Sequence, residues 1–158
     1  MKSEKVERVK QIADLVVLQE DAIRQHPHKV LDVYIKSRDA FIEGQSSAII
    51  DESSKSISLT PDQMSLVNRY MLSSSFISAW YHLAGNKTNR DKAAHSCCTL
   101  VSCLGLNPEA AMTKYIEFEQ LWRLTMKNEG VAPKRFYRIG FIAIIIVIIL
   151  LGVLYSRY

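Results

Sequence analysis

Apolar residues recur at intervals of three or four along most of the chain, and short breaks rich in Gly, Pro, Ser and Asn separate these stretches. Such spacing is typical of amphipathic helices that bury one side in a shared core. It predicts five helices, over residues 3–25, 27–43, 61–84, 88–104 and 108–128. The Ser-rich segment 44–59 is predicted to be a loop, in which residues 48–50 and 56–59 could pair as a small hairpin. The predicted fold is therefore all-α, with a five-helix bundle over residues 1–133.

Two of the predicted helices begin with strong capping signals. The Thr-Pro-Asp-Gln sequence at residues 60–63 places Thr60 at the N-cap, Pro at the first helical position and Gln at the third, which completes a capping box. Asn107, followed by Pro, repeats this pattern at the last helix. Thr88 or Asn89 is the candidate cap of the fourth helix.

The helix predicted over residues 61–84 is apolar on almost every face, relieved mainly by three consecutive serines at 73–75. A helix with this pattern is normally central in a bundle. We therefore predict that the core forms around it, from Val67, Tyr70, Ile77, Trp80, Tyr81, Val101, Tyr115, Phe118 and Trp122.

Residues 139–155 form a different pattern, an uninterrupted run with no charge, amide or proline in which every residue except two glycines is apolar or aromatic. As a helix this run would be roughly 26 Å long, close to the thickness of a bilayer's hydrocarbon core. A buried core helix or a central strand is the alternative, because Ile and Val favour strands. A run that is apolar on all sides has no face to show water, so we predict a transmembrane helix over 139–155.

Basic and aromatic residues flank this run, as they do at membrane interfaces. More basic residues precede the run than follow it, which predicts a cytosolic N-terminal domain. The membrane would be a bacterial inner membrane or a eukaryotic organelle membrane. Residues 134–138 are then a basic juxtamembrane linker and 156–158 a short tail, so that the protein is expected to be single-pass and tail-anchored. The predicted membrane-anchoring residues are Lys134, Arg135, Phe136, Tyr137, Arg138, Tyr155 and Arg157.

The net charge of +4 belongs to the flanks of the apolar run. Four of the 20 Lys and Arg residues lie at positions 134, 135, 138 and 157, and all 16 Asp and Glu residues precede them. The charges of residues 1–133 therefore cancel. Because a nucleic-acid interface needs clustered basic residues on the folded domain, this balance argues against nucleic acid as a partner and favours anionic lipid beside the span.

The three cysteines and one histidine of the fourth predicted helix are candidates for metal binding or thiol chemistry. His95, Cys97, Cys98 and Cys103 diverge around a helix at 100° per residue, whereas zinc needs four converging ligands. Cys97 and Cys98 are therefore interpreted as small core residues. Free thiols are also consistent with a reducing cytosol.

Two further histidines, His26 and His28, flank Pro27 and are interpreted as solvent-exposed turn residues, although such a pair can bind metal or titrate near neutrality. The sequence contains no Gly-rich phosphate loop, no G-x-S-x-G elbow and no H-E-x-x-H motif. We therefore predict no cofactor, no metal and no small-molecule substrate.

A short part of the chain resembles one tetratricopeptide repeat, although Gly85-Asn86 interrupts the first helix of that repeat and no second copy follows. This resemblance implies a helical hairpin. The overall layout is similar to that of tail-anchored adaptors on mitochondria, including Bcl-2-type proteins, whose Asn-Trp-Gly-Arg signature is absent here. The residues at the key spacings of the repeat are Trp80, Leu83, Ala84, Ser96, Cys103 and Pro108.

These patterns lead us to expect a tail-anchored membrane protein whose helical domain acts as an interaction or adaptor module for a protein partner. The alternative is a subunit of a multiprotein membrane complex for secretion, transport or exclusion, in which the span itself contacts other spans. A third possibility, of a different class, is a small membrane-bound thiol enzyme that uses Cys97, Cys98 or His95.

Overall fold

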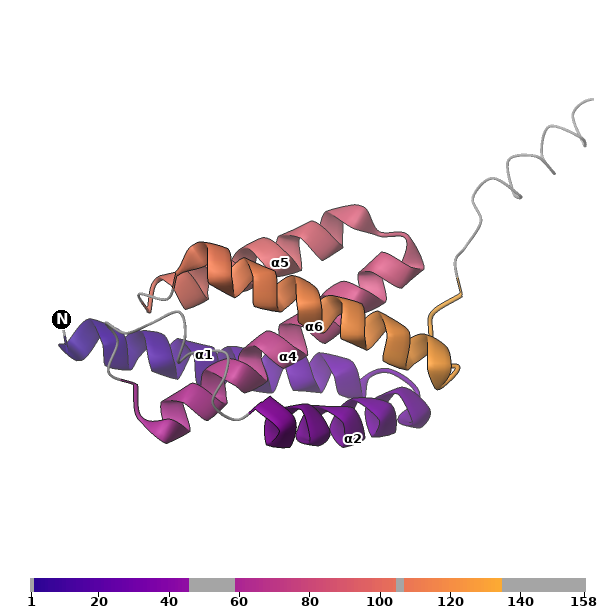
Figure 1. The fold of residues 1–158 in the computed structure, drawn as a ribbon, viewed down its shortest axis with the longest axis horizontal. Coiled ribbons are helices and arrows are strands. Elements are labelled where there is room, and N and C mark those ends of the chain that lie inside the picture. The colour runs from indigo at the N-terminus through magenta and orange to yellow at the C-terminus, as the bar shows by residue number, and fades with distance from the viewer. Residues whose placement is uncertain (1, 46–58, 105–106, 135–158) are drawn as a thin grey trace, which may run out of the picture.

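The computed structural model describes residues 2–45, 59–104 and 107–134. Within these ranges the regular structure is entirely helical, which confirms the all-α prediction. Figure 1 shows the helices, which are α1 Lys2–Arg24, α2 His28–Gln45, α4 Pro61–Ala84, α5 Lys87–Ser102 and α6 Pro108–Asn128.

Several predicted features lie outside the described residues: the possible hairpin apart from Leu59, most of the linker 134–138, the transmembrane helix 139–155 and the tail 156–158. Of the predicted anchoring residues, Lys134 is described and is exposed. None of the helices that the structure describes has the length and apolar character needed to cross a membrane. The anchoring residues outside the described ranges are Arg135, Phe136, Tyr137, Arg138, Tyr155 and Arg157.

Side-chain caps begin α4 and α6 at the predicted residues. Thr60 Oγ1 accepts a hydrogen bond from the Gln63 amide at 3.2 Å, and Gln63 Oε1 accepts one from the Thr60 amide at 3.1 Å. Asn107 Oδ1 accepts a hydrogen bond from the Glu109 amide at 2.9 Å. Each cap supplies an acceptor to a backbone amide that has no partner within its own helix.

The break between α4 and α5 is shorter than predicted. Gly85 ends α4 in the left-handed conformation, with φ of 80°. Asn86, rather than Thr88 or Asn89, is the N-cap of α5, because its Oδ1 accepts a hydrogen bond from the Asn89 amide at 3.1 Å. Helices α4 and α5, which are joined by this two-residue break and pack against each other, form the helical hairpin that the resemblance implies, with its turn at residues 85–86.

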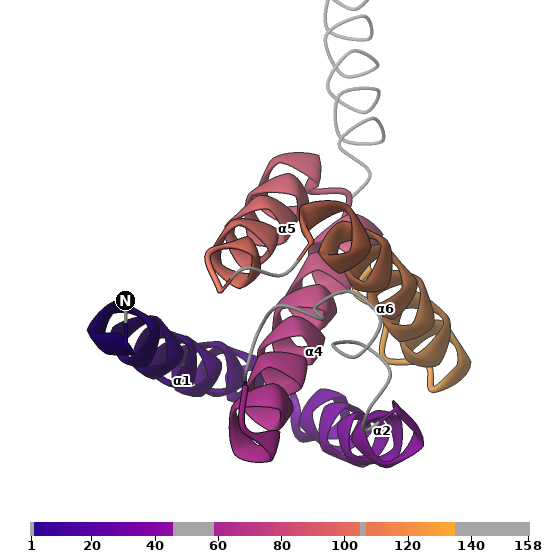
Figure 2. The ribbon, with the colours of Figure 1, turned by 60° about the vertical axis from the view of Figure 1, so that its left-hand side comes forward.

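Helix α4 lies at the centre of the bundle and contacts all four of the other described helices. Figure 2 shows α4 in the middle, with α1 and α5 on one side of it and α2 and α6 on the other. The serines that interrupt its apolar sequence are not a solvent-exposed face, because Ser73, Ser74, Ser75 and Ser78 are at most 1 % exposed. Their small side chains leave room for the neighbouring helices to approach.

Trp122 of α6 is the largest fully buried side chain and joins three helices. Its ring lies 4.9 to 5.6 Å, between centroids, from those of Tyr34, Phe41 and Phe76. Its Nε1 donates a hydrogen bond to the Leu72 carbonyl at 3.0 Å. Because aromatic side chains bury more area than other residues, this cluster is a main source of core stability.

Most of the predicted core residues are buried, but Ile77, Trp80 and Tyr81 are partly exposed, which corrects the prediction. Ile77 and Trp80 pack against the edge of the core. Helices α1 and α4 run in the same direction, with Gln19 bonded to Ser73 and the His26 ring against Trp80. Because α1 ends at Arg24, the last two turns of α4 extend beyond it. The predicted core residues that the structure buries are Val67, Tyr70, Val101, Tyr115, Phe118 and Trp122.

Candidate functional site

Two buried carboxylates hold the helices together on opposite sides of α4. The first is Glu20 of α1, whose side chain is 9 % exposed. Its Oε1 accepts hydrogen bonds from Arg69 Nε at 2.7 Å, Arg38 Nη1 at 3.0 Å and the Tyr34 hydroxyl at 3.1 Å. Burial alone would raise the pKa of Glu20, but the hydrogen bonds and positive charges of Arg69 and Arg38 outweigh burial and hold this pKa below its usual value. The cluster therefore joins α1, α2 and α4 through one ionised carboxylate.

The second buried carboxylate is Glu119 of α6, whose side chain is 4 % exposed. It accepts hydrogen bonds from the Ser78 hydroxyl at 2.9 Å and from Arg90 Nε at 3.1 Å. His82 Nδ1 lies 3.5 Å from it, and His82 Nε2 lies 2.9 Å from Arg123 Nη1. This cluster joins α4, α5 and α6.

Both carboxylates already accept several hydrogen bonds from side chains of the chain itself. Buried charges that are paired and hydrogen-bonded in this way are typical of structural ion-pair clusters. We therefore interpret Glu20 and Glu119 as residues that fix the positions of the helices rather than as catalytic acids.

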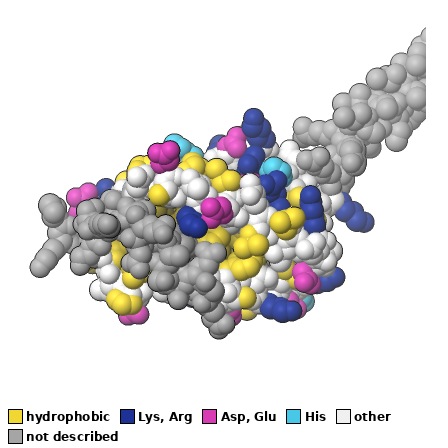
Figure 3. Space-filling view, viewed as in Figure 1, with side chains coloured by type: hydrophobic (Ala, Val, Ile, Leu, Met, Phe, Trp, Pro, Cys, Tyr) yellow, Lys and Arg dark blue, Asp and Glu magenta, His cyan; other side chains and the backbone are white. Residues whose placement is uncertain are grey.

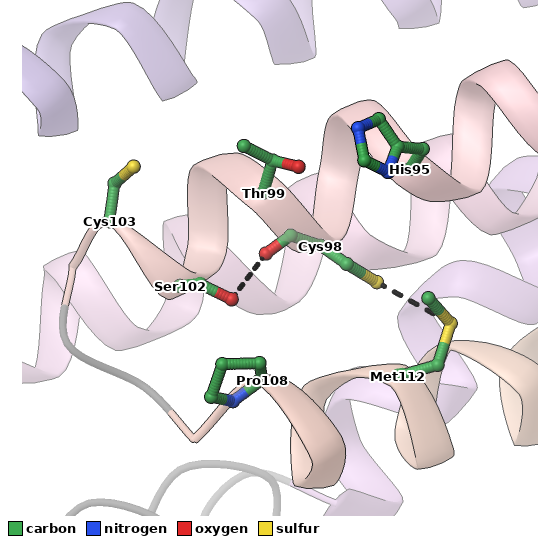
Figure 4. Close-up of a pocket in the computed structure, with 7 residues that line it drawn as sticks. All are labelled: His95, Cys98, Thr99, Ser102, Cys103, Pro108 and Met112. Carbon is green, nitrogen blue, oxygen red and sulfur yellow. Dashed lines mark hydrogen bonds between the residues drawn. The ribbon is translucent and has the colours of Figure 1, made fainter.

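An open groove of about 390 Å³ lies between α5 and α6 and is the candidate binding surface of the domain. Figure 4 shows Cys98 and Met112 pointing toward one another across it, with Cys98 Sγ 3.9 Å from Met112 Sδ. Met112 is 36 % exposed, and Ile116, one turn further along α6, is 44 % exposed. The residues that line the groove are His95, Cys98, Thr99, Ser102, Cys103, Pro108 and Met112.

The structure separates the three cysteines. Cys97 faces the core and is 0 % exposed, whereas Cys98 and Cys103 line the groove together with His95. Within the described ranges, no three His, Cys, Asp or Glu side chains are arranged to hold a metal ion. Burial raises the pKa of both the Cys97 and the Cys98 thiols. A nucleophilic thiol needs the opposite shift.

The histidines of the α1–α2 turn differ from one another. His28 is exposed, as predicted, but His26 is partly buried because the turn folds back against the end of α4. Its ring lies 4.2 Å from that of Trp80, between centroids, and burial lowers its pKa. The two rings lie at a pocket of about 270 Å³ that Ile77 and Tyr81 also line.

The carboxylate clusters escaped the sequence analysis, although a signal for them exists. Glu20 lies four residues after Val16 and three before Ile23, and both of these are buried on the same side of α1. Glu119 stands in the same relation to Tyr115 and Trp122 in α6. A single acidic residue on an apolar stripe indicates a buried and paired charge. Its partners are distant in the sequence, so the pairing itself could not be read there.

Comparisons of the chain with protein-family models, with curated proteins and with solved structures found no match.

Proposed function

We propose that this protein is a membrane-anchored interaction module, in which residues 139–155 span the bilayer and the helical domain binds a protein partner on the cytosolic side. The observation that carries the proposal is the uninterrupted apolar run at 139–155 with its basic and aromatic flanks. A segment with this composition is stable in lipid and has no polar side that would stabilise it at the surface of a water-soluble domain.

The arrangement of the described domain supports an interaction role. Its two buried carboxylates accept hydrogen bonds from within the chain, and two of its three thiols are buried. The α5–α6 groove, in contrast, presents Met112 to solvent, and Ile116 is exposed one turn further along α6. Flexible apolar side chains such as Met are common at protein-binding surfaces. This groove is therefore the candidate contact surface of the module.

Membrane insertion is tested by extracting cell membranes with alkaline carbonate. We expect the full chain to stay in the pellet, and the variant Ile146→Leu, which keeps the run apolar, to behave in the same way. Ile146→Arg places a charge at the centre of the span, at a cost of about 3 kcal/mol, and should shift a measurable fraction into the supernatant. Recovery of the unaltered full chain in the soluble fraction without detergent would contradict the proposal.

The partner-binding role is tested by affinity capture from detergent extracts, with and without residues 134–158. Binding that survives the truncation favours an interaction module. Loss of binding on truncation favours the alternative, a subunit that assembles through its span.

Surface variants then locate the contact. Met112→Glu and Ile116→Glu should abolish capture if the groove is used. Leu124→Glu is the matched control, since Leu124 is exposed on the same helix but away from the groove. Circular dichroism of each variant shows whether the fold is retained.

A further inference from the structure

Five helix ends meet at the end of the bundle from which the chain leads toward residues 139–155. Helices α1, α4 and α6 end there, and α2 and α5 begin there, as Figure 1 shows. Side-chain contacts link these ends: the His26 ring lies against Trp80, and His82 lies 2.9 Å from Arg123. We call this the membrane-proximal end and define its basic residues as Arg24, Lys29, Lys87, Lys127 and Lys134.

The basic residues of this end, apart from Lys134, lie at two kinds of helix terminus. The last turns of α1, α4 and α6 contain Arg24, His82 and Lys127. Arg24 and Lys127 are cations at helix C-termini, where they complement the helix dipole, so these two positions need no further explanation.

The two helices that begin at this end are different. The first turns of α2 and α5 contain Lys29 and Lys87 and no acidic residue. The helix dipole disfavours a cation at an N-terminus. Both lysines are exposed, and neither forms an ion pair within the part of the chain that the structure describes. Local helix stability therefore gives no reason for basic residues at these two positions.

The opposite end of the bundle has the reverse charge pattern. Helices α4 and α6 begin there with Asp62 and Glu109 in their first turns, and the first turn of α1 contains Lys2, Glu4 and Lys5. Helices α2 and α5 end there with no basic residue in their last turns. A domain whose charges cancel overall is therefore polarised along its helices.

Figure 3 shows Lys and Arg side chains gathered beside the point where the chain leaves the membrane-proximal end. Acidic residues are present as well: Asp21 lies 3.9 Å from Arg24, and Asp91 and Glu129 lie in the same part of the bundle. Lys29, Lys87, Lys127 and Lys134 are all exposed, and so are these three acidic residues, so the basic residues of this end outnumber the acidic ones by a small margin.

We propose that the membrane-proximal end of the bundle rests on anionic lipid headgroups, with Lys29, Lys87, Lys127 and Lys134 facing the lipid phosphates. This inference rests on the proposed membrane anchor, which would hold this end, and no other, within a few residues of the bilayer. Basic residues near a bilayer surface are attracted by anionic lipids, and the attraction decays within a Debye length of about 8 Å at physiological salt. Lys134 lies five residues before the run at 139–155, and the helix ends that contain the other three lysines lie at the same end of the bundle.

The test uses the full chain reconstituted in vesicles of phosphatidylcholine alone or with added phosphatidylglycerol, each containing a headgroup-attached quencher. One fluorophore is placed at Thr88→Cys, in the first turn of α5, with Cys103→Ser to remove the exposed native thiol. A second sample is labelled at native Cys103, at the opposite end of α5. We expect strong quenching at position 88 only in the anionic vesicles, little quenching at position 103 in either, and loss of the position-88 effect at high salt.

Charge variants make the result specific. Each lysine near the surface contributes about a fivefold factor to lipid association, so Lys29→Gln with Lys87→Gln should lower the ratio of docked to undocked domain by about 25-fold. Lys10→Gln with Lys114→Gln removes the same charge nearer the opposite end and should leave the ratio unchanged. Equal quenching in both vesicle types, or equal effects of the two variant pairs, would overturn the inference. If lipid did not quench the fluorophore at position 88 but an acidic protein shielded that position, the lipid proposal would be overturned in favour of a protein partner.

Carbonate treatment of the same vesicles separates this inference from the anchor itself. If the chain resists extraction but shows no lipid-dependent quenching, the proposed anchor is supported and the proposed contact with headgroups is refuted. If the chain is extracted, the proposed anchor is refuted, but sedimentation with anionic vesicles at low salt still measures whether the basic end of the domain binds lipid. If the chain sediments with these vesicles and the Lys29→Gln/Lys87→Gln variant does not, the lipid-binding role of the basic end is supported. If the natural chain does not sediment with them, that role is refuted.

Discussion

Glu20 and its arginines provide a quantitative test of how α1, α2 and α4 are held together. Glu20→Gln keeps the size of the side chain but removes the charge that Arg69, Arg38 and Tyr34 share. Each hydrogen bond to a charged group contributes about 1.5–3 kcal/mol. Loss of the carboxylate leaves Arg69 without its anion and leaves Arg38 with Asp39, whose Oδ1 lies 2.9 Å from Arg38 Nη2. Because Arg69 and Arg38 are 42 % and 16 % exposed, water recovers part of this loss, and we expect about 3 kcal/mol of destabilisation.

Arg69→Gln should cost much less, about 1 kcal/mol. Glu20 keeps its bonds to Arg38 and Tyr34 in this variant, and the pair that is lost includes a side chain 42 % exposed, so solvent screens it. The carboxylate at the centre of the cluster is thus expected to matter more than either arginine around it.

Thermal unfolding of the full chain in mild detergent, followed by far-UV circular dichroism, measures both changes. For a domain of this size 1 kcal/mol corresponds to about 3–5 °C, so Glu20→Gln should lower Tm by about 10 °C and Arg69→Gln by about 4 °C. Glu7→Gln is the matched control, since Glu7 is exposed on the same helix and should change stability by less than about 0.5 kcal/mol. If Arg69→Gln proved as costly as Glu20→Gln, the interpretation of Glu20 as the centre of the cluster would be wrong.

Three further predictions follow from caps, burial and charge. The pKa of Glu20 is lower in the folded state than its unfolded value of about 4.3, so the stability that ionised Glu20 contributes is present above that value and is lost as the pH falls through the folded pKa. The difference in unfolding free energy between the natural chain and Glu20→Gln, measured by urea unfolding, should therefore narrow only below about pH 4. Thr60→Ala removes the acceptor of the capping box and should lower stability by about 1 kcal/mol in the same assay, with Thr60→Ser nearly neutral. A maleimide reagent should modify Cys103 rapidly in the folded chain, and Cys97 and Cys98 only after denaturation, because Cys103 alone of the three is exposed; mass spectrometry that finds more than one rapid addition would contradict this burial.

The features that could be predicted from sequence are those that depend on nearby residues. The capping box at Thr60 and the cap at Asn107 involve partners two or three residues away, so their positions follow from the sequence alone. The break at Gly85 also follows from the sequence, but which of Asn86, Thr88 and Asn89 caps α5 depends on local geometry.

Features that depend on the relative placement of helices could not be predicted. Glu20 meets Arg69 across 49 positions of sequence, and Glu119 meets Ser78 across 41. The α5–α6 groove has the same origin, since Cys98 and Met112 come together only after the two helices pack. Trp80 illustrates the error that results: its helix is central, but the end of α1 leaves that part of α4 partly uncovered.

The two proposals are mutually consistent in space. The groove between α5 and α6 is lined by the last turns of α5 and the first turns of α6, including Ser102 and Pro108. It therefore lies at the end of the bundle opposite to Lys87, and α5, which has 16 residues, separates the two ends by about 24 Å. A domain that rests on lipid through its basic end would present the groove away from the bilayer. A cytosolic partner could then reach Met112 without competing with headgroups. The anchor, the basic end and the groove would follow one another along the direction of the helices.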